Sequence, residues 1–113
     1  ASIAAATGIP RLAVYSATKG AIVSFTKALA MELGPHTVTV NSVSPGLIAE
    51  GTQALESDGT FLGRRGTAAE VASLIAFLAS DEASYCTGGE YLVDGGWPVR
   101  PAWRRRPSGP SPR

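Results

Sequence analysis

The stretch Tyr15-Ser16-Ala17-Thr18-Lys19 decides how the rest of the chain is interpreted. A tyrosine and a lysine four residues apart lie on the same face of a helix, one turn apart. An ammonium about 4–5 Å from a phenol favours the phenolate, so we expect Lys19 to lower the Tyr15 pKa from its ordinary value of about 10. Such a pair can pass protons near neutral pH. The spacing alone equally fits an exposed aromatic–lysine pair without chemistry, so the surrounding sequence has to decide.

Three further motifs surround this helix in a definite order. Ser2 lies 13 residues before Tyr15, Asn-Ser-Val-Ser-Pro-Gly occupies residues 41–46, and Glu-Tyr-Leu-Val-Asp-Gly-Gly occupies residues 90–96. Together, from residue 1 to about 98, they resemble the C-terminal half of the short-chain dehydrogenase/reductase family. The resemblance implies an α/β fold, the C-terminal part of a doubly wound parallel-sheet (Rossmann-like) domain. The glycine-rich turn of the family's dinucleotide-binding half has no counterpart in the 113 residues, so we expect that N-terminal half to be missing.

The resemblance also implies an activity. A family member of this type is an NAD(P)-dependent oxidoreductase that transfers a hydride between a nicotinamide cofactor and a carbonyl/alcohol substrate. In that role Tyr15 gives or takes the hydroxyl proton, and Lys19 lowers the tyrosine pKa and holds the cofactor ribose. Ser2 hydrogen-bonds the reacting oxygen. Ser2 also fits a plain turn serine, and its spacing to Tyr15 favours the catalytic interpretation.

The cofactor contacts implied by the resemblance lie after a predicted strand. Ligands of parallel sheets bind at the carboxyl ends of the strands, and that end carries Pro45 and Gly46 here. Proline stiffens the turn, while glycine lets a flat ring approach the backbone. The family places the nicotinamide carboxamide at this turn, with the backbone of Ile48 as a contact. The sequence does not distinguish NAD from NADP.

Local patterns predict the remaining elements. An apolar stripe at helical spacing predicts a helix over about 13–33, which ends at Gly34-Pro35 with glycine as the left-handed cap; the stripe consists of Ile22, Phe25, Leu29 and Leu33. β-Branched residues predict a strand over 37–43. Thr67 and Glu70 form a capping box that starts a helix ending near Ser80. A last short strand covers Tyr91–Val93, and in the family the segment 49–66 covers the substrate.

Composition and charge limit the other classes of function. The chain is 44% hydrophobic and 17% charged, with one cysteine, one histidine and a formal net charge of +1. That composition suits a globular protein, and it leaves neither an intrachain disulfide nor a cysteine-based metal site. Residues 1–99 carry a net charge of −4, whereas residues 100–113 carry +5 and are rich in proline. We therefore predict one segment of a Rossmann-like oxidoreductase domain over 1–98 and a disordered tail over 99–113.

Partners follow from the same considerations. We expect a small-molecule carbonyl/alcohol substrate and a homo-oligomer, either a dimer or a tetramer. No apolar run is long enough to span a bilayer and no signal peptide is recognisable, so we expect a cytoplasmic protein without a membrane contact. The arginines of the tail favour nucleic acid only weakly, because no basic fold stands behind them. The alternative function is a non-catalytic remnant that self-associates through the helix at 15–33.

Overall fold

The computed structural model describes residues 13–56 and 59–96. Ser2, the predicted tail and the predicted boundary at residue 98 lie outside these ranges. The elements in chain order are α2 (Ala13–Leu33), the 3-10 helix η1 (Gly34–His36), β1 (Ser42–Pro45), α3 (Ala68–Leu78), the 3-10 helix η2 (Asp81–Ala83) and β2 (Glu90–Val93). No described helix is long and apolar enough to cross a membrane.

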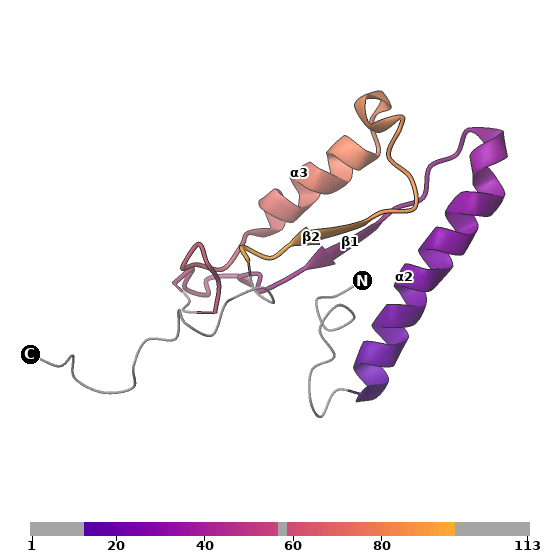
Figure 1. The fold of residues 1–113 in the computed structure, drawn as a ribbon. Helices are drawn as coiled ribbons and strands as arrows, with labels where there is room; N and C mark the ends of the chain where they lie inside the picture. The colour runs from indigo at the N-terminus through magenta and orange to yellow at the C-terminus, as the bar shows by residue number, and fades with distance from the viewer. Residues whose placement is uncertain (1–12, 57–58, 97–113) are drawn as a thin grey trace, which may run out of the picture.

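The two strands form a parallel pair. Ser42 lies opposite Glu90 and Pro45 lies opposite Val93. Figure 1 shows α3 on one side of this pair and α2 on the other, with both helices running against the strand direction. A strand followed by a helix and a second, parallel strand is the α/β unit that the sequence predicts. The parallel sheet of the predicted fold class is therefore confirmed for this part of the chain.

The helix α2 has the predicted bounds, but its end differs from the prediction. Gly34 and Pro35 continue the chain as η1 instead of reversing it. The left-handed residue is Thr37, with φ at 59°, and its N–H donates to the Gly34 carbonyl at 2.9 Å. The prediction that Gly34 takes the left-handed position is wrong, because the extra 3-10 turn moves the reversal three residues along the chain.

The predicted strand at 37–43 is shifted towards its carboxyl end. Regular pairing begins only at Ser42, because β2 itself begins at Glu90. Before that point isolated hydrogen bonds join the two segments. The Gly88 N–H donates to the Val40 carbonyl at 2.7 Å, the Val40 N–H donates to Thr87 Oγ1 at 3.0 Å, and Asn41 Nδ2 donates to the Cys86 carbonyl at 2.8 Å. β-Branched composition marked the extended segment, while the position of the partner strand decided which part became β1.

The helix α3 begins as predicted. The N–H of Glu70 donates to Thr67 Oγ1 at 3.2 Å, and the N–H of Thr67 donates to Glu70 Oε1 at 3.1 Å. These two bonds are the reciprocal pair of a capping box, which satisfies N–H groups that a helix start leaves unpaired. The helix ends at Leu78 with Ala79 as its C-cap, slightly before the expected Ser80.

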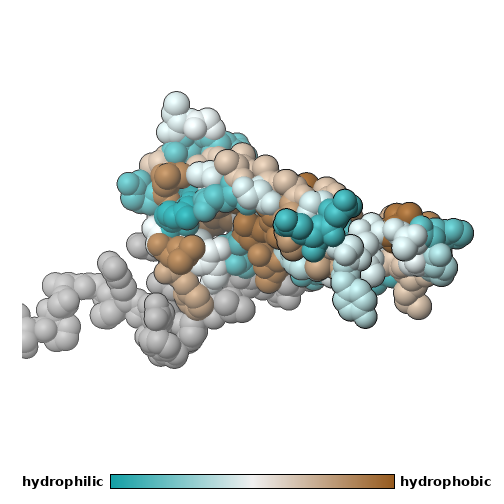
Figure 2. Space-filling model, turned by 90° about the horizontal axis from the view of Figure 1, so that it is seen from above, coloured by the Kyte–Doolittle hydropathy of each residue, from teal (hydrophilic) through white to brown (hydrophobic). Residues whose placement is uncertain are grey.

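Only small side chains are fully buried in the described part. The buried apolar residues are Ala30 and Ala83, and the buried polar residues are Thr26, Ser42, Ser44 and Thr60. The face of α2 that contacts the sheet thus carries small residues: a Cβ at Gly88 would lie 3.6 Å from that of Ala30. Large apolar side chains remain at the surface, and Figure 2 shows several of them in brown among polar residues.

Candidate active site

Tyr15 and Lys19 lie together on the first two turns of α2. The Lys19 ammonium nitrogen is 5.4 Å from the centroid of the Tyr15 ring, over its face. This is a cation–π contact, in which the ring quadrupole attracts the charge. The tyrosine is 44% exposed. The structure therefore brings these two predicted site residues into contact, whereas Ser2 lies outside the described ranges.

A second tyrosine, Tyr91, is held in a different environment. Tyr91, on β2, has its pKa raised by a hydrogen bond with Cys86 and by partial burial. A raised pKa makes a phenol a poorer proton donor near neutral pH. Cys86 itself is half-buried, as a structural thiol would be. Tyr91 therefore belongs to the packing between β2 and the loop before it.

Pro45 and Gly46 lie at the carboxyl end of β1. The Gly46 N–H donates to the Val93 carbonyl at 2.9 Å and extends the pairing of the strands by one bond. A Cβ built on Gly46 would lie 2.7 Å from the Asp94 Cβ and 2.8 Å from its Cα. From the sequence, this glycine is expected to let a ligand approach the backbone. The structure gives a second reason, because the chain after β2 already occupies the space of a side chain.

Ile48 presents free backbone groups beside this turn. It forms a parallel bridge with Gly66, made by the Ala49 N–H donating to the Gly66 carbonyl at 2.9 Å and the Gly66 N–H donating to the Leu47 carbonyl at 2.8 Å. In this geometry the N–H and C=O of Ile48 point away from Gly66. Within the part of the chain that the structure describes, neither group has a hydrogen-bond partner. A polar ligand group can therefore pair with them.

The arrangement places the helix start and the strand ends towards the same end of the unit. The chain of α2 runs against β1, so its first turns lie towards the carboxyl ends of the strands (Figure 1). In open α/β sheets ligands bind at this edge. The described ranges contain no group of three or more His, Cys, Asp or Glu side chains that could hold a metal ion.

The sequence did not predict two interactions, one before the strands and one beside the start of α3. Asn41 bonds the loop before β2 through both amide atoms, donating to Cys86 and accepting from the Gly89 N–H at 3.2 Å. Arg64 and Glu70 form an ion pair in which Nη1 and Nη2 donate to Oε1 and Oε2 at 2.8 and 2.9 Å. Hydrogen bonds from Arg64 and from the Thr67 N–H lower the pKa of Glu70 to about 2. The only signal in the sequence was an arginine six residues before a capping glutamate.

Known proteins are similar to this chain over most of its length. A family model described as enoyl-(acyl carrier protein) reductase matches residues 1–98. A 3-alpha-(or 20-beta)-hydroxysteroid dehydrogenase of Mycobacterium bovis is 48% identical over 85 residues, which cover 73% of this chain and 33% of the relative. The chain thus spans about a third of the length of that relative.

Solved structures agree in fold. A short-chain type dehydrogenase/reductase from Mycobacterium ulcerans superimposes with a TM-score of 0.80 and 37% identity, covering 88% of this chain and 40% of that one. A 4-hydroxyisoleucine dehydrogenase complexed with NADH and succinate gives the same TM-score and 37% identity over 88% of this chain and 44% of its own. The matched family model, the order of the motifs and the contact between Tyr15 and Lys19 lead to one conclusion: the chain belongs to the short-chain dehydrogenase/reductase family.

Proposed function

We propose that the protein carrying this chain is an NAD(P)-dependent oxidoreductase that interconverts a carbonyl compound and the corresponding alcohol. The observation that carries the proposal is the contact between Tyr15 and Lys19 at the start of α2. Relatives named as dehydrogenases support the class of reaction. Because the chain covers 33% of the hydroxysteroid dehydrogenase, the activity is proposed for the whole protein and not for this segment alone.

In the proposed reaction Tyr15 moves a proton and Lys19 assists it. The phenol donates its proton to the carbonyl oxygen during reduction and accepts it from the alcohol during oxidation. The ammonium over the ring stabilises negative charge as it develops on the phenol oxygen, and it also binds the cofactor ribose. Ser2 orients the substrate oxygen by a hydrogen bond. The residues of this chain thus bind the substrate and the cofactor and move the proton, and they do not themselves transfer the electrons.

The residues after β1 fit a nicotinamide cofactor. A nicotinamide carboxamide has one C=O and one NH₂, which match the N–H and C=O of Ile48 that have no partner among the described residues. Pro45 and Gly46 hold that backbone against the exit of β2. When bound, the cofactor supplies or accepts the hydride. A solved relative in complex with NADH supports this class of cofactor, and we propose NAD or NADP without preference.

A chimera tests the proposal. Residues 1–98 replace the matching segment of the mycobacterial hydroxysteroid dehydrogenase, and reduction of a ketone is followed through NADH absorbance. Tyr15→Phe keeps the ring and removes the transferable proton, so turnover should fall at least about 100-fold. Tyr85→Phe is the matched control, because Tyr85 is fully exposed away from the site. Turnover of the Tyr15 variant within a factor of two of its parent would remove Tyr15 from the mechanism.

A second candidate function is self-association through α2. Val14, Phe25 and Met31 on this helix are 81%, 65% and 80% exposed. Helices that leave apolar side chains in water gain free energy when a partner covers them. This observation favours the homo-oligomer expected from the sequence, and it fits a non-catalytic remnant as well as an enzyme subunit. Loss of activity in the chimera together with retained association would favour the remnant.

A further inference from the structure

The segment between β1 and α3 closes on itself at the edge where the proposed site lies. It leaves the sheet after Pro45 and returns at Thr67, the N-cap of α3. Its two ends meet in the bridge between Ile48 and Gly66. Gly66 fits closely there, because a Cβ at this position would lie 3.0 Å from Ile48 Cδ1. Two backbone hydrogen bonds of this bridge join Gly66 to Leu47 and Ala49, on either side of Ile48.

The second half of the segment is held by hydrogen bonds within itself and by one bond to the chain after β2. Thr60 is 6% exposed, and its hydroxyl both donates to the Arg64 carbonyl at 2.9 Å and accepts from the Arg64 N–H at 3.2 Å. The Leu62 N–H donates to the Gly95 carbonyl at 3.2 Å, beyond β2. Residues 50–56 are all exposed by contrast. They meet the second half at an isolated antiparallel bridge between Glu56 and Arg64, where the Arg65 N–H donates to the Leu55 carbonyl.

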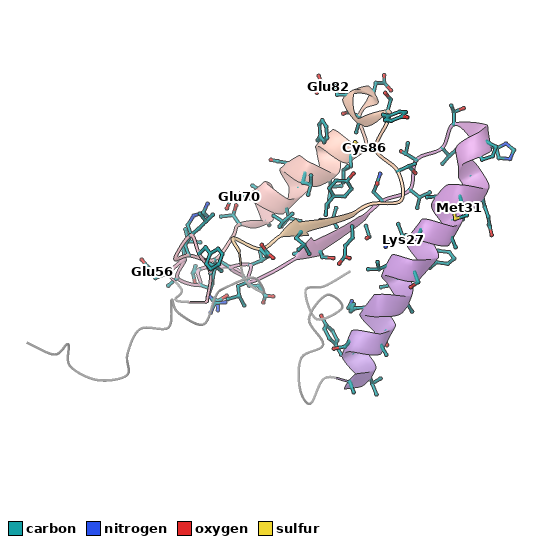
Figure 3. All side chains as sticks on the ribbon, in the orientation of Figure 1. Lys27, Met31, Glu56, Glu70, Glu82 and Cys86 are labelled. Carbon is teal, nitrogen blue, oxygen red and sulfur yellow. The ribbon has the colours of Figure 1, made fainter. Side chains whose placement is uncertain are left out.

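One carboxylate links this fixed half to the start of α3. Glu70 accepts from the Thr67 N–H in the capping box and from both guanidinium nitrogens of Arg64. Arg64 Nη1 also donates to the Arg65 carbonyl at 3.0 Å, next to Gly66. A fork-shaped guanidinium on a carboxylate fixes direction as well as distance. Figure 3 shows Glu70 at the α3 start, facing the segment that ends there.

We propose that Arg64 and Glu70 are positioning residues that hold Gly66, and through it the Ile48 backbone, in the orientation that binds the cofactor. The proposal rests on the function proposed above, because Ile48 has its role only in a nicotinamide site. The pair acts without touching a ligand: the ion pair fixes residues 64–66 relative to α3, and the Gly66 bridge carries that position to Leu47 and Ala49.

The test measures amide hydrogen exchange by NMR in the complete 113-residue chain at pH 7. The reporters are the Ala49 and Gly66 amides, and the references are the Ser42 and Gly46 amides of the strand pair. Glu70→Gln keeps a residue that can complete a capping box but removes the ion pair. Arg64→Gln removes the same ion pair by changing its other partner. Arg65→Gln is the matched control on the neighbouring arginine.

We expect exchange at Ala49 and Gly66 to become about two- to fivefold faster in the Arg64 and Glu70 variants, the range for a half-exposed ion pair. Exchange at the Ser42 and Gly46 amides should stay as in the parent. In the Arg65 variant, exchange at all four amides should stay as in the parent. Arg64→Lys, which keeps the charge and loses the fork, should restore part of the protection. The proposal would be overturned if exchange became faster by the same factor at all four amides. It would also be overturned if exchange at Ala49 and Gly66 were unchanged in both the Arg64 and the Glu70 variant. A parent chain in which Ala49 and Gly66 exchange as in an unfolded peptide would overturn it as well.

The cofactor role is then tested in the chimera by NADH titration. We expect Arg64→Gln to raise the NADH dissociation constant about two- to fivefold, with Arg65→Gln again unchanged. An unchanged dissociation constant in the Arg64 variant would overturn the positioning role even if the exchange rates respond. Full turnover in the Tyr15 variant would contradict the proposed chemistry. It would not affect the hydrogen-exchange test of Arg64 and Glu70, so the two failures can be told apart.

Discussion

The Glu70 carboxylate takes part both in the capping box of α3 and in the ion pair with Arg64. Both interactions therefore depend on pH through the titration of this one group. Its pKa lies at about 2, below the ordinary 4.5, because Arg64 and the Thr67 N–H stabilise the ionised form. The pKa of Arg64 is raised in turn by Glu70. A carboxyl whose pKa is depressed in the folded state stabilises that state above its unfolded pKa. The contribution is lost as the pH falls through the folded pKa.

Glu70→Gln should therefore reveal this contribution as a pH-dependent difference in stability. Urea denaturation of parent and variant should show the largest difference in midpoint above about pH 4.5. The difference should shrink between pH 4.5 and 2 as the parent carboxylate is protonated. High salt should reduce it at neutral pH, because the Debye length falls to about 3 Å at 1 M. A difference that stays constant from pH 7 to pH 2 would contradict the assignment to the ion pair.

At the scale of elements, the exits of β1 and β2 are packed without room for a side chain. A Cβ on Gly46 would meet both Cα and Cβ of Asp94 below 3.0 Å, and backbone cannot move aside as a flexible side chain can. The helix interior offers the opposite case. Gly20 in α2 has no atom within 4 Å of its missing Cβ, apart from the helix's own backbone and its chain neighbours. Among the described residues, no other element approaches Gly20 closely enough to require a glycine there.

These two glycines give a matched pair of substitutions. Gly46→Ala should lower the free energy of unfolding by about 1–3 kcal/mol, because the strand exits have to separate. Gly20→Ala should raise it by about 0.5–1 kcal/mol, because alanine loses less backbone entropy in a helix. Urea denaturation of both variants measures the two effects with the same chemical change. A stabilising Gly46→Ala would show that the contact with Asp94 is absent in solution.

At the scale of the molecule, the described part leaves much apolar surface unpaired. A cleft of about 810 Å³ lies between residues 37–43 and the end of α3, lined by Val38, Val43, Ile75 and Leu78 among others. Two parallel strands with one helix on each side are a small unit, and parallel sheets are ordinarily covered on both faces by larger assemblies. We therefore expect the isolated chain to associate with itself.

Sedimentation velocity tests this association. The chain alone should sediment as a dimer or larger species at micromolar concentration, and Phe25→Glu should shift it towards smaller species because it places a charge on the exposed α2 face. Lys27→Gln, on the same helix and also exposed, changes the net charge by the same one unit and is the control for charge alone. A monomeric parent would exclude self-association through this helix.

The isolated chain should also bind NADH weakly or not at all. A dinucleotide's pyrophosphate is held by N–H groups at a glycine-rich turn before a helix, and the 113 residues contain no such motif. Only the nicotinamide end would find contacts, at Tyr15, Lys19 and the turn after β1. Fluorescence titration with NADH measures this directly. Binding at micromolar concentration, with reduction of a ketone, would overturn the interpretation of this chain as part of a larger binding unit.

The sequence by itself determined what depends on neighbouring residues. The bounds of α2, the capping box at Thr67 and the pairing of Tyr15 with Lys19 follow from spacing along one helix, where residues four apart must meet. The parallel α/β unit followed from the order of elements. Each of these features needs only helical geometry or short connections, so a pattern of residues is sufficient to specify it.

Only the tertiary structure decided features that depend on distant segments. The beginning of β1 at Ser42 depends on where β2 lies, 48 residues along the chain. The left-handed Thr37 depends on how far the 3-10 turn continues before the chain meets the sheet. The bridge of Ile48 with Gly66 needs the whole 49–66 segment to close on itself. Such contacts leave no periodic pattern in the sequence, because two segments create them together.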